Sequence, residues 1–100
     1  MAVKTVTVDR YVVDTLLGDL VGHDHRASSF LVYLHLATRP AAGRQRRITA
    51  SYADLGHGTG LSKSAVQAAV RNLKRRRLVR VERTSSTATP VYEVLRPWNR

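Results

Sequence analysis

The stretch TASYADLGHGTGLSKSAVQAAVRNLKRRRLVRV, residues 49–81, decides the fold. It predicts two short helices that are joined by a glycine turn and followed by a strand. Ser51 is a suitable N-cap for the first helix, and Asp54 lies three residues further on, which is the spacing of a capping box. We expect Gly58-Thr59-Gly60 to break this helix, because glycine adopts positive φ at little cost.

The second helix of the pair is expected over residues 62–76, with Ser62 at its start. Its buried face is predicted from apolar residues at helical spacing: Val66, Ala69, Val70 and Leu73. Its opposite face carries polar and basic residues: Lys63, Ser64, Gln67, Arg71, Lys74 and Arg75. That face has no apolar residues against which another helix or strand could pack. This pattern is typical of a helix that reads nucleic acid.

Residues 52–79, YADLGHGTGLSKSAVQAAVRNLKRRRLV, and residues 79–95, VRVERTSSTATPVYEVL, resemble the winged helix-turn-helix domain of bacterial regulators. Multiple-antibiotic-resistance regulators, gluconate-repressor regulators and plasmid replication initiators carry this domain. The positions that match are Leu55, Gly60-Leu61-Ser62, Val66, Val70, Leu73 and Leu78-Val79. The resemblance covers about half of the chain, and fold alone does not imply function.

The resemblance implies a mainly α fold with a small antiparallel β-wing and an additional N-terminal helix. We expect one domain over residues 1–100, with an arm and helix at 1–25, the winged helix at 26–95 and a tail at 96–100. Two residues depart from the family pattern. Gly56 stands where Ala is usual, which costs a helix about 1 kcal/mol. Arg77 stands where a Gly usually precedes the wing strand, so the exit from the helix is expected to differ.

The net charge of +10 is unevenly distributed. Residues 1–43 contain four basic and four acidic residues and are therefore neutral, so residues 44–100 carry the whole excess. A concentrated positive field favours a polyanionic partner, because each neutralised phosphate releases a condensed counterion. A bias of coding toward arginine explains the arginine content but not this division between the halves. The charge pattern favours nucleic acid as the partner.

The N-terminal part of the chain predicts one further helix after a β-branched start, KTVTV, which fits a short strand or an extended arm. We expect Asp9 to cap a helix that runs to about Val21 and that Gly22 ends. Six aliphatic residues form one predicted apolar face: Val12, Val13, Leu16, Leu17, Leu20 and Val21. This face requires a cover, either the 26–38 helix of the same chain or the same helix of a second chain. We favour a homodimer, because paired reading helices recognise palindromic sites.

Three further segments complete the expected architecture. A helix over residues 26–38 ends at Pro40, and residues 41–45 form a loop before a short strand at residues 46–49. Alternation predicts strands at residues 78–83 and 91–95, joined by the polar tip TSSTATP. Trp98 fits either a plug on the core or an exposed contact for a partner.

Histidines in two places raise the question of a metal site. His23-Asp24-His25 lacks further ligands, and side chains at i and i+2 in a loop diverge, so we expect no metal there. Asp24 or Ser28 is expected instead to cap the following helix. His35 lies among apolar residues of that helix and is expected to be partly buried rather than a ligand.

Several functional classes are disfavoured. The chain contains no cysteine, so disulfides and thiolate zinc sites are excluded. No apolar run approaches the roughly 18 residues of a membrane span, and no signal-peptide pattern is present, so a cytoplasmic location is expected. GHGTG lies within the predicted helix-turn-helix rather than after a strand, and no catalytic pairing is evident. We therefore expect that the protein is not an enzyme and that it binds neither a cofactor nor a small-molecule ligand.

The favoured function is sequence-specific binding of double-stranded DNA by a small transcriptional regulator. The alternative is a winged helix that acts as a protein-interaction module or a replication- or plasmid-linked adaptor. In the DNA-binding interpretation, Ser62 opens the reading helix, and Ser64, Gln67 and Arg71 reach base edges. The residues expected to hold phosphates are Lys63, Lys74, Arg75 and Arg83.

Overall fold

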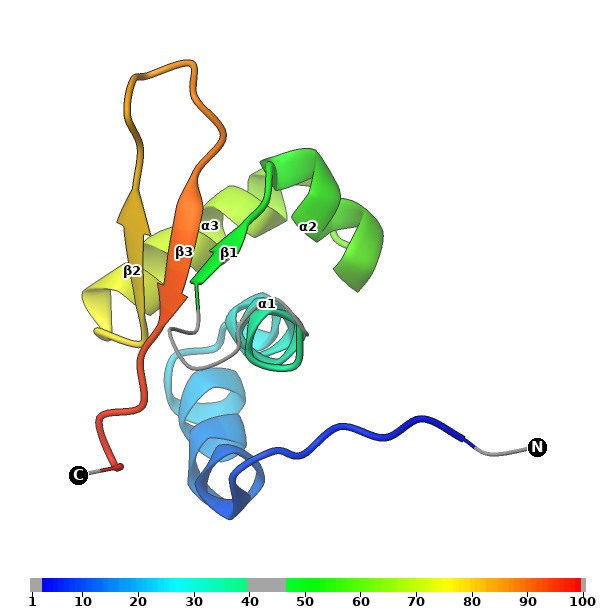
Figure 1. Cartoon of the computed structure of the whole chain (residues 1–100). Helices are drawn as coiled ribbons and strands as arrows, with labels where there is room; N and C mark the ends of the chain where they lie inside the picture. The colour runs from blue at the N-terminus through cyan, green and yellow to red at the C-terminus, as the bar shows by residue number, and fades with distance from the viewer. Residues whose placement is uncertain (1–2, 40–46, 100) are drawn as a thin grey trace.

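The computed structural model describes residues 3–39 and 47–99. In these residues the chain is mainly helical and has a small three-stranded antiparallel sheet, as expected (Figure 1). The elements in chain order are η1 (Val12–Leu16), η2 (Asp19–His23), α1 (Ala27–Ala37), β1 (Arg47–Thr49), α2 (Tyr52–Thr59), α3 (Lys63–Arg75), β2 (Val79–Glu82) and β3 (Val91–Val94). The predicted helix end at Pro40, the loop at 41–45 and Arg46 of the predicted strand lie outside the described residues.

The segments η1 and η2 belong to one helical stretch, residues 10–23, here called the N-terminal helix. Residues 3–9 before it form no strand, and Figure 1 shows them as an extended arm. The expectation that the Asp9 side chain caps this helix is wrong. The Asp9 carboxylate accepts a hydrogen bond from Trp98 Nε1 at 3.0 Å and pairs with Arg96 Nε at 3.2 Å. The helix also continues through Gly22 to His23.

Trp98 packs on the chain itself, which answers the question that its sequence position leaves open. Its ring stacks on Tyr11 with centroids 4.6 Å apart, and it lies tilted against Tyr33 at 6.3 Å. The C-terminal residues 96–98 are therefore tied to the start of the N-terminal helix.

The aliphatic residues of the N-terminal helix divide into two sets, so the prediction of a single apolar face is wrong. Val12, Leu16 and Leu20 are buried in the core. Exposed fractions are 56% for Val13, 37% for Leu17 and 40% for Val21. Packing within the same chain thus covers only half of the predicted face.

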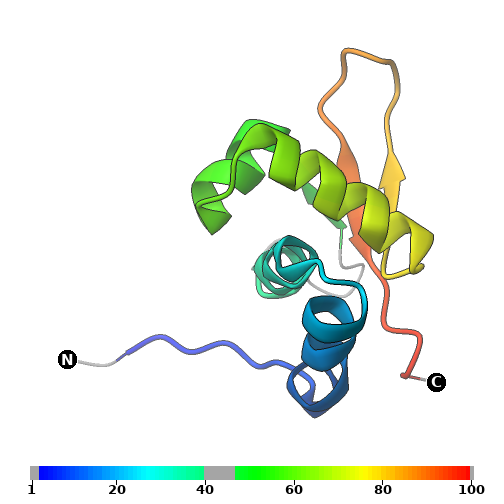
Figure 2. The same cartoon turned by 180° about the vertical axis from the view of Figure 1, so that it is seen from behind.

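Helix α1 is the centre of the fold and lies between the N-terminal helix and the pair α2 and α3 (Figures 1 and 2). Its side chains Val32, Tyr33 and Leu36 are fully buried. Its N-cap is Arg26, without a side-chain capping bond, so the prediction that Asp24 or Ser28 caps it is wrong. The Tyr33 hydroxyl donates to the Leu95 carbonyl at 3.0 Å, which joins α1 to the end of β3.

Helices α2 and α3 begin with the expected caps. Ser51 and Asp54 form the predicted reciprocal capping box, and the Ser62 hydroxyl accepts from the Ala65 amide. Gly60 ends α2 in the left-handed region at φ 78°. Gly58, which was expected to break the helix, lies inside α2, and a Cβ there would lie 2.2 Å from the His35 ring. Glycine at this position therefore permits α2 to pack closely on α1.

The exit from α3 passes through Arg77, at the position where the sequence resemblance leads us to expect a glycine. Arg77 has φ 58°, a left-handed conformation that costs a non-glycine residue roughly 1 kcal/mol or more. The Leu78 amide then donates to the Leu73 carbonyl at 2.9 Å, and Leu78 is buried. The chain thus turns directly from α3 into β2.

The sheet has the order β1-β3-β2, and both neighbours of β3 are antiparallel to it. Ile48 lies opposite Tyr92, and Val81 lies opposite the same residue on the other side. Ile48, Val79, Tyr92 and Val94 are buried against the helices. The β2–β3 hairpin projects beyond the helices (Figure 1).

Candidate nucleic-acid interface

Helix α3 is strongly amphipathic, as the sequence predicts. Val66, Ala69, Val70 and Leu73 are buried, as expected. Of the predicted site residues on α3 and its N-cap, Gln67 is half-buried and the others are exposed: Ser62, Lys63, Ser64, Arg71, Lys74 and Arg75. Figure 2 shows α3 nearest the viewer, with no described segment in front of it. The structure therefore brings seven of the eight predicted site residues onto one helix and its N-cap.

The ion pairs of the described residues leave this face uncompensated. On the hairpin and β1, Arg80 pairs with Glu93 at 2.9 Å and Arg47 with Glu82 at 2.6 Å. At the C-terminal end of α3, the C-cap Arg76 pairs with Asp24 and Asp19. Within residues 3–39 and 47–99, Lys63, Arg71 and Lys74 have no such partner. The available carboxylates thus neutralise the sheet and the helix junction but not the outer face of α3.

Arg83, the eighth predicted site residue, lies away from α3 at the end of β2. Its guanidinium donates to the Tyr52 hydroxyl at 3.1 Å and lies 5.5 Å from the centre of the Tyr52 ring. Tyr52 is the first residue of α2. Arg83 therefore connects the base of the hairpin tip to the N-terminal end of α2 and retains an exposed positive charge.

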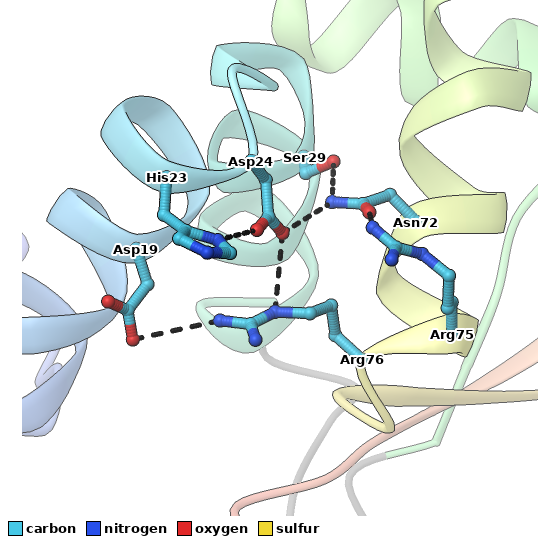
Figure 3. Close-up of polar contacts among 7 residues, drawn as sticks. All are labelled: Asp19, His23, Asp24, Ser29, Asn72, Arg75 and Arg76. Atoms are coloured by element: carbon cyan, nitrogen blue, oxygen red, sulfur yellow. Dashed lines mark hydrogen bonds and ion pairs between the residues drawn. The ribbon is translucent and has the colours of Figure 1, made fainter.

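A buried polar cluster lies on the side of α3 that faces the N-terminal helix (Figure 3). Asn72 is 5% exposed, and its Nδ2 donates to Asp24 Oδ2 at 3.1 Å and to Ser29 Oγ at 3.0 Å. Its Oδ1 accepts a hydrogen bond from Arg75 at 2.5 Å. The amide thus joins three helical segments and also fixes an arginine of the predicted site. Sequence reasoning missed Asn72, because its partners Asp24 and Ser29 lie 48 and 43 residues away along the chain.

The Asp24 carboxylate is the acidic centre of this cluster. Its side chain is 3% exposed and lies 2.8 Å from His23 Nδ1 and 3.2 Å from Arg76 Nε. The hydrogen bond with His23 lowers the pKa of Asp24 most, and Asn72 and Arg76 lower it further, against the opposing effect of burial. Asp24 therefore connects helices as a carboxylate. Among the described residues no group of three or more His, Cys, Asp or Glu side chains is placed to hold a metal ion.

His35 is half-buried in α1, as its position among apolar residues predicts. Burial lowers its pKa, and the charge of Arg39 lowers it further.

No helix in the described part of the chain is long and apolar enough to span a membrane.

Comparisons with protein-family models, with curated proteins and with solved structures found no match to this chain.

Proposed function

We propose that this chain is a winged helix-turn-helix protein that binds double-stranded DNA in a sequence-specific manner, as a small bacterial transcriptional regulator. The observation that carries the proposal is the exposed, uncompensated row of Lys63, Arg71, Lys74 and Arg75 on α3. The element order helix, strand, helix, helix, two-stranded hairpin is compatible with this fold. An α-helix fits the major groove, where base pairs are distinguishable.

The roles of the residues follow from their place on α3. Ser64 and Gln67 lie in its first half and Arg71 one turn after Gln67, so these three side chains would contact base edges from one face of the helix. Gln pairs with adenine and Arg with guanine in two-bond contacts. The residues that would hold backbone phosphates are Lys63, Lys74, Arg75 and Arg83.

The dependence of binding on salt tests this proposal. The affinity of the wild type for duplex DNA should fall linearly on a double-logarithmic plot against salt concentration. The expected slope is about −3 to −5 for four or five phosphate contacts, since each contributes about −0.9. Fluorescence anisotropy with a labelled random duplex measures it. A wild type that fails to bind duplex DNA at low salt would contradict the proposal and favour the protein-interaction alternative.

The exposed aliphatic residues of the N-terminal helix favour a protein partner in addition to DNA. Val13, Leu17 and Val21 lie on this helix, and Leu31 of α1 is 42% exposed. We propose that the partner is a second copy of this chain, which pairs through the N-terminal helix. Residues 3–39 contain equal numbers of acidic and basic side chains, so two copies would approach there without the repulsion of the basic half.

A further inference from the structure

A hollow of about 250 Å³ lies where the start of α1 meets the outer face of α3. Its lining is almost entirely arginine and small residues: Arg26, Ala68, Arg71, Asn72 and Arg75. Arg26 is the N-cap of α1, and the other four residues belong to α3. Ala68 is small, and three arginines from two elements line one opening.

The charge in this hollow is uncompensated by the described residues. Neither Arg26 nor Arg71 pairs with an acidic group within residues 3–39 and 47–99. The acidic groups of the neighbouring junction, Asp19 and Asp24, are engaged by Arg76 at 3.6 and 3.2 Å. Like charges that converge without a counter-charge repel one another, which favours a bound anion.

One of the three arginines, Arg75, is held in place by the buried polar cluster around Asn72. Arg75 donates to Asn72 Oδ1, and the Asn72 amide is itself fixed by Asp24 and Ser29 (Figure 3). Because the Asp24 carboxylate is an acceptor, the NH₂ group of Asn72 must face it. The amide oxygen of Asn72 must then face Arg75. The guanidinium of Arg75 therefore loses little conformational entropy when it binds a ligand.

We infer that this hollow binds a phosphate group, held by Arg26 and Arg75. The planar guanidinium offers parallel N–H donors that match two oxygens of a phosphate. Arg71 lies one turn nearer the N-terminal end of α3 and keeps its contact with a base edge, while its charge adds to the field in the hollow. If the proposed function holds, the phosphate belongs to the DNA backbone on the α1 side of α3. A free phosphorylated molecule is the other source of the same group.

Arg26→Gln tests this site, with Arg39→Gln as the matched control. Arg26 is the N-cap of α1 and Arg39 follows its C-cap, and both changes remove one charge, but Arg39 does not line the hollow. Arg26→Gln should lower the affinity for duplex DNA by up to about tenfold at 0.1 M salt and make the salt slope shallower by about 0.9, equally for all sequences. Arg75→Gln should do the same, and Arg39→Gln should leave the slope unchanged. Circular dichroism verifies the fold of each variant.

A second measurement separates the two sources of phosphate. The thermal midpoint is compared in inorganic phosphate and in chloride of equal ionic strength, for the wild type and for Arg26→Gln. If the wild type fails to bind DNA but phosphate stabilises it and not Arg26→Gln, the site stands and the proposed function falls. If DNA binds and Arg26→Gln behaves like Arg39→Gln, the phosphate site is wrong and the proposed function stands. If neither DNA nor phosphate binds, both are wrong.

Discussion

Asp24 shows how one residue can hold several helices together. A buried carboxylate is costly unless it is paired and hydrogen-bonded. Here His23 bonds it from the N-terminal helix, while Asn72 and Arg76 bond it from α3 and its C-cap. Asp19 faces the same guanidinium of Arg76 at 3.6 Å. The charged form of Asp24 is therefore stabilised in the folded state, and its pKa lies below the ordinary value of 3.8.

The lowered pKa of Asp24 predicts a defined pH dependence of stability. A carboxyl with a depressed folded-state pKa stabilises the fold above its unfolded value, and this contribution is lost as the pH falls through the folded pKa. Asp24→Asn should lower the free energy of unfolding by about 1–3 kcal/mol at pH 7, since it removes hydrogen bonds to a charged group. The difference from wild type should shrink as the pH falls below 3.8. Urea unfolding at a series of pH values measures it.

Asp14→Asn is the matched control for this prediction. Asp14 is 53% exposed and pairs with Arg10 at 3.5 Å, so its loss should change stability little. The pKa of Asp54 is also lowered, chiefly by the Ser51 amide, and both variants retain this contribution. A constant difference between wild type and Asp24→Asn over the whole acidic range would show that the Asp24 carboxylate does not stabilise the junction.

At the scale of elements, the sequence predicts best where the signals are local. Helix α3 was expected over 62–76 and runs over Lys63–Arg75 with Ser62 and Arg76 as its caps, because N-cap side chains and helical spacing act within a few residues. The capping box of α2 was also predicted. The bounds of α1 were also predicted to within one residue, but its cap was not. The expected cap Asp24 bonds instead to Asn72, 48 residues further along the chain.

The N-terminal helix shows why its buried face could not be assigned from the sequence. The six aliphatic residues occur as adjacent pairs at positions 12–13, 16–17 and 20–21. Both members of each pair repeat every four residues, so periodicity alone does not tell which set is buried. Packing against the rest of the core decides for Val12, Leu16 and Leu20. The helix was predicted, but its orientation depends on the rest of the fold.

The candidate site was predicted in part for the same reason. The polar residues of α3 share a face because of helical spacing alone, which a sequence reveals. Arg26 was missed because it lies 45 residues before Arg71, and only the packing of α1 against α3 brings the two to one hollow. Asn72 was missed because its partners Asp24 and Ser29 are equally distant in sequence.

At the scale of the whole molecule, charge and apolar surface are distributed separately. The basic excess belongs to residues 44–100, whereas all the large aliphatic residues that are exposed in the described chain precede residue 32. A protein that pairs through one region and binds a polyanion with another has this distribution. Two copies of α3 spaced about one DNA turn apart would contact successive major grooves.

Substitutions on the exposed set of the N-terminal helix test the homodimer. We expect the wild type to sediment as a dimer at tens of micromolar and Val13→Glu/Leu17→Glu to sediment as a folded monomer. Both residues are already exposed in the single chain, so the fold should tolerate the change. Leu16→Glu, at a position 3% exposed, should instead unfold the protein. A monomeric wild type at this concentration would eliminate the dimer.

Selection of binding sites from a pool of random duplexes, with wild type and Arg71→Ala, tests whether the outer face of α3 reads DNA. Arg10→Ala, which removes an exposed arginine of the N-terminal helix, is the control for lost charge. The wild type and the control should select the same motif. Arg71→Ala should bind that motif about 1–3 kcal/mol more weakly and lose preference at one base pair. If Arg71→Ala selects the same motif with the same affinity as the wild type, α3 does not read DNA in the manner proposed.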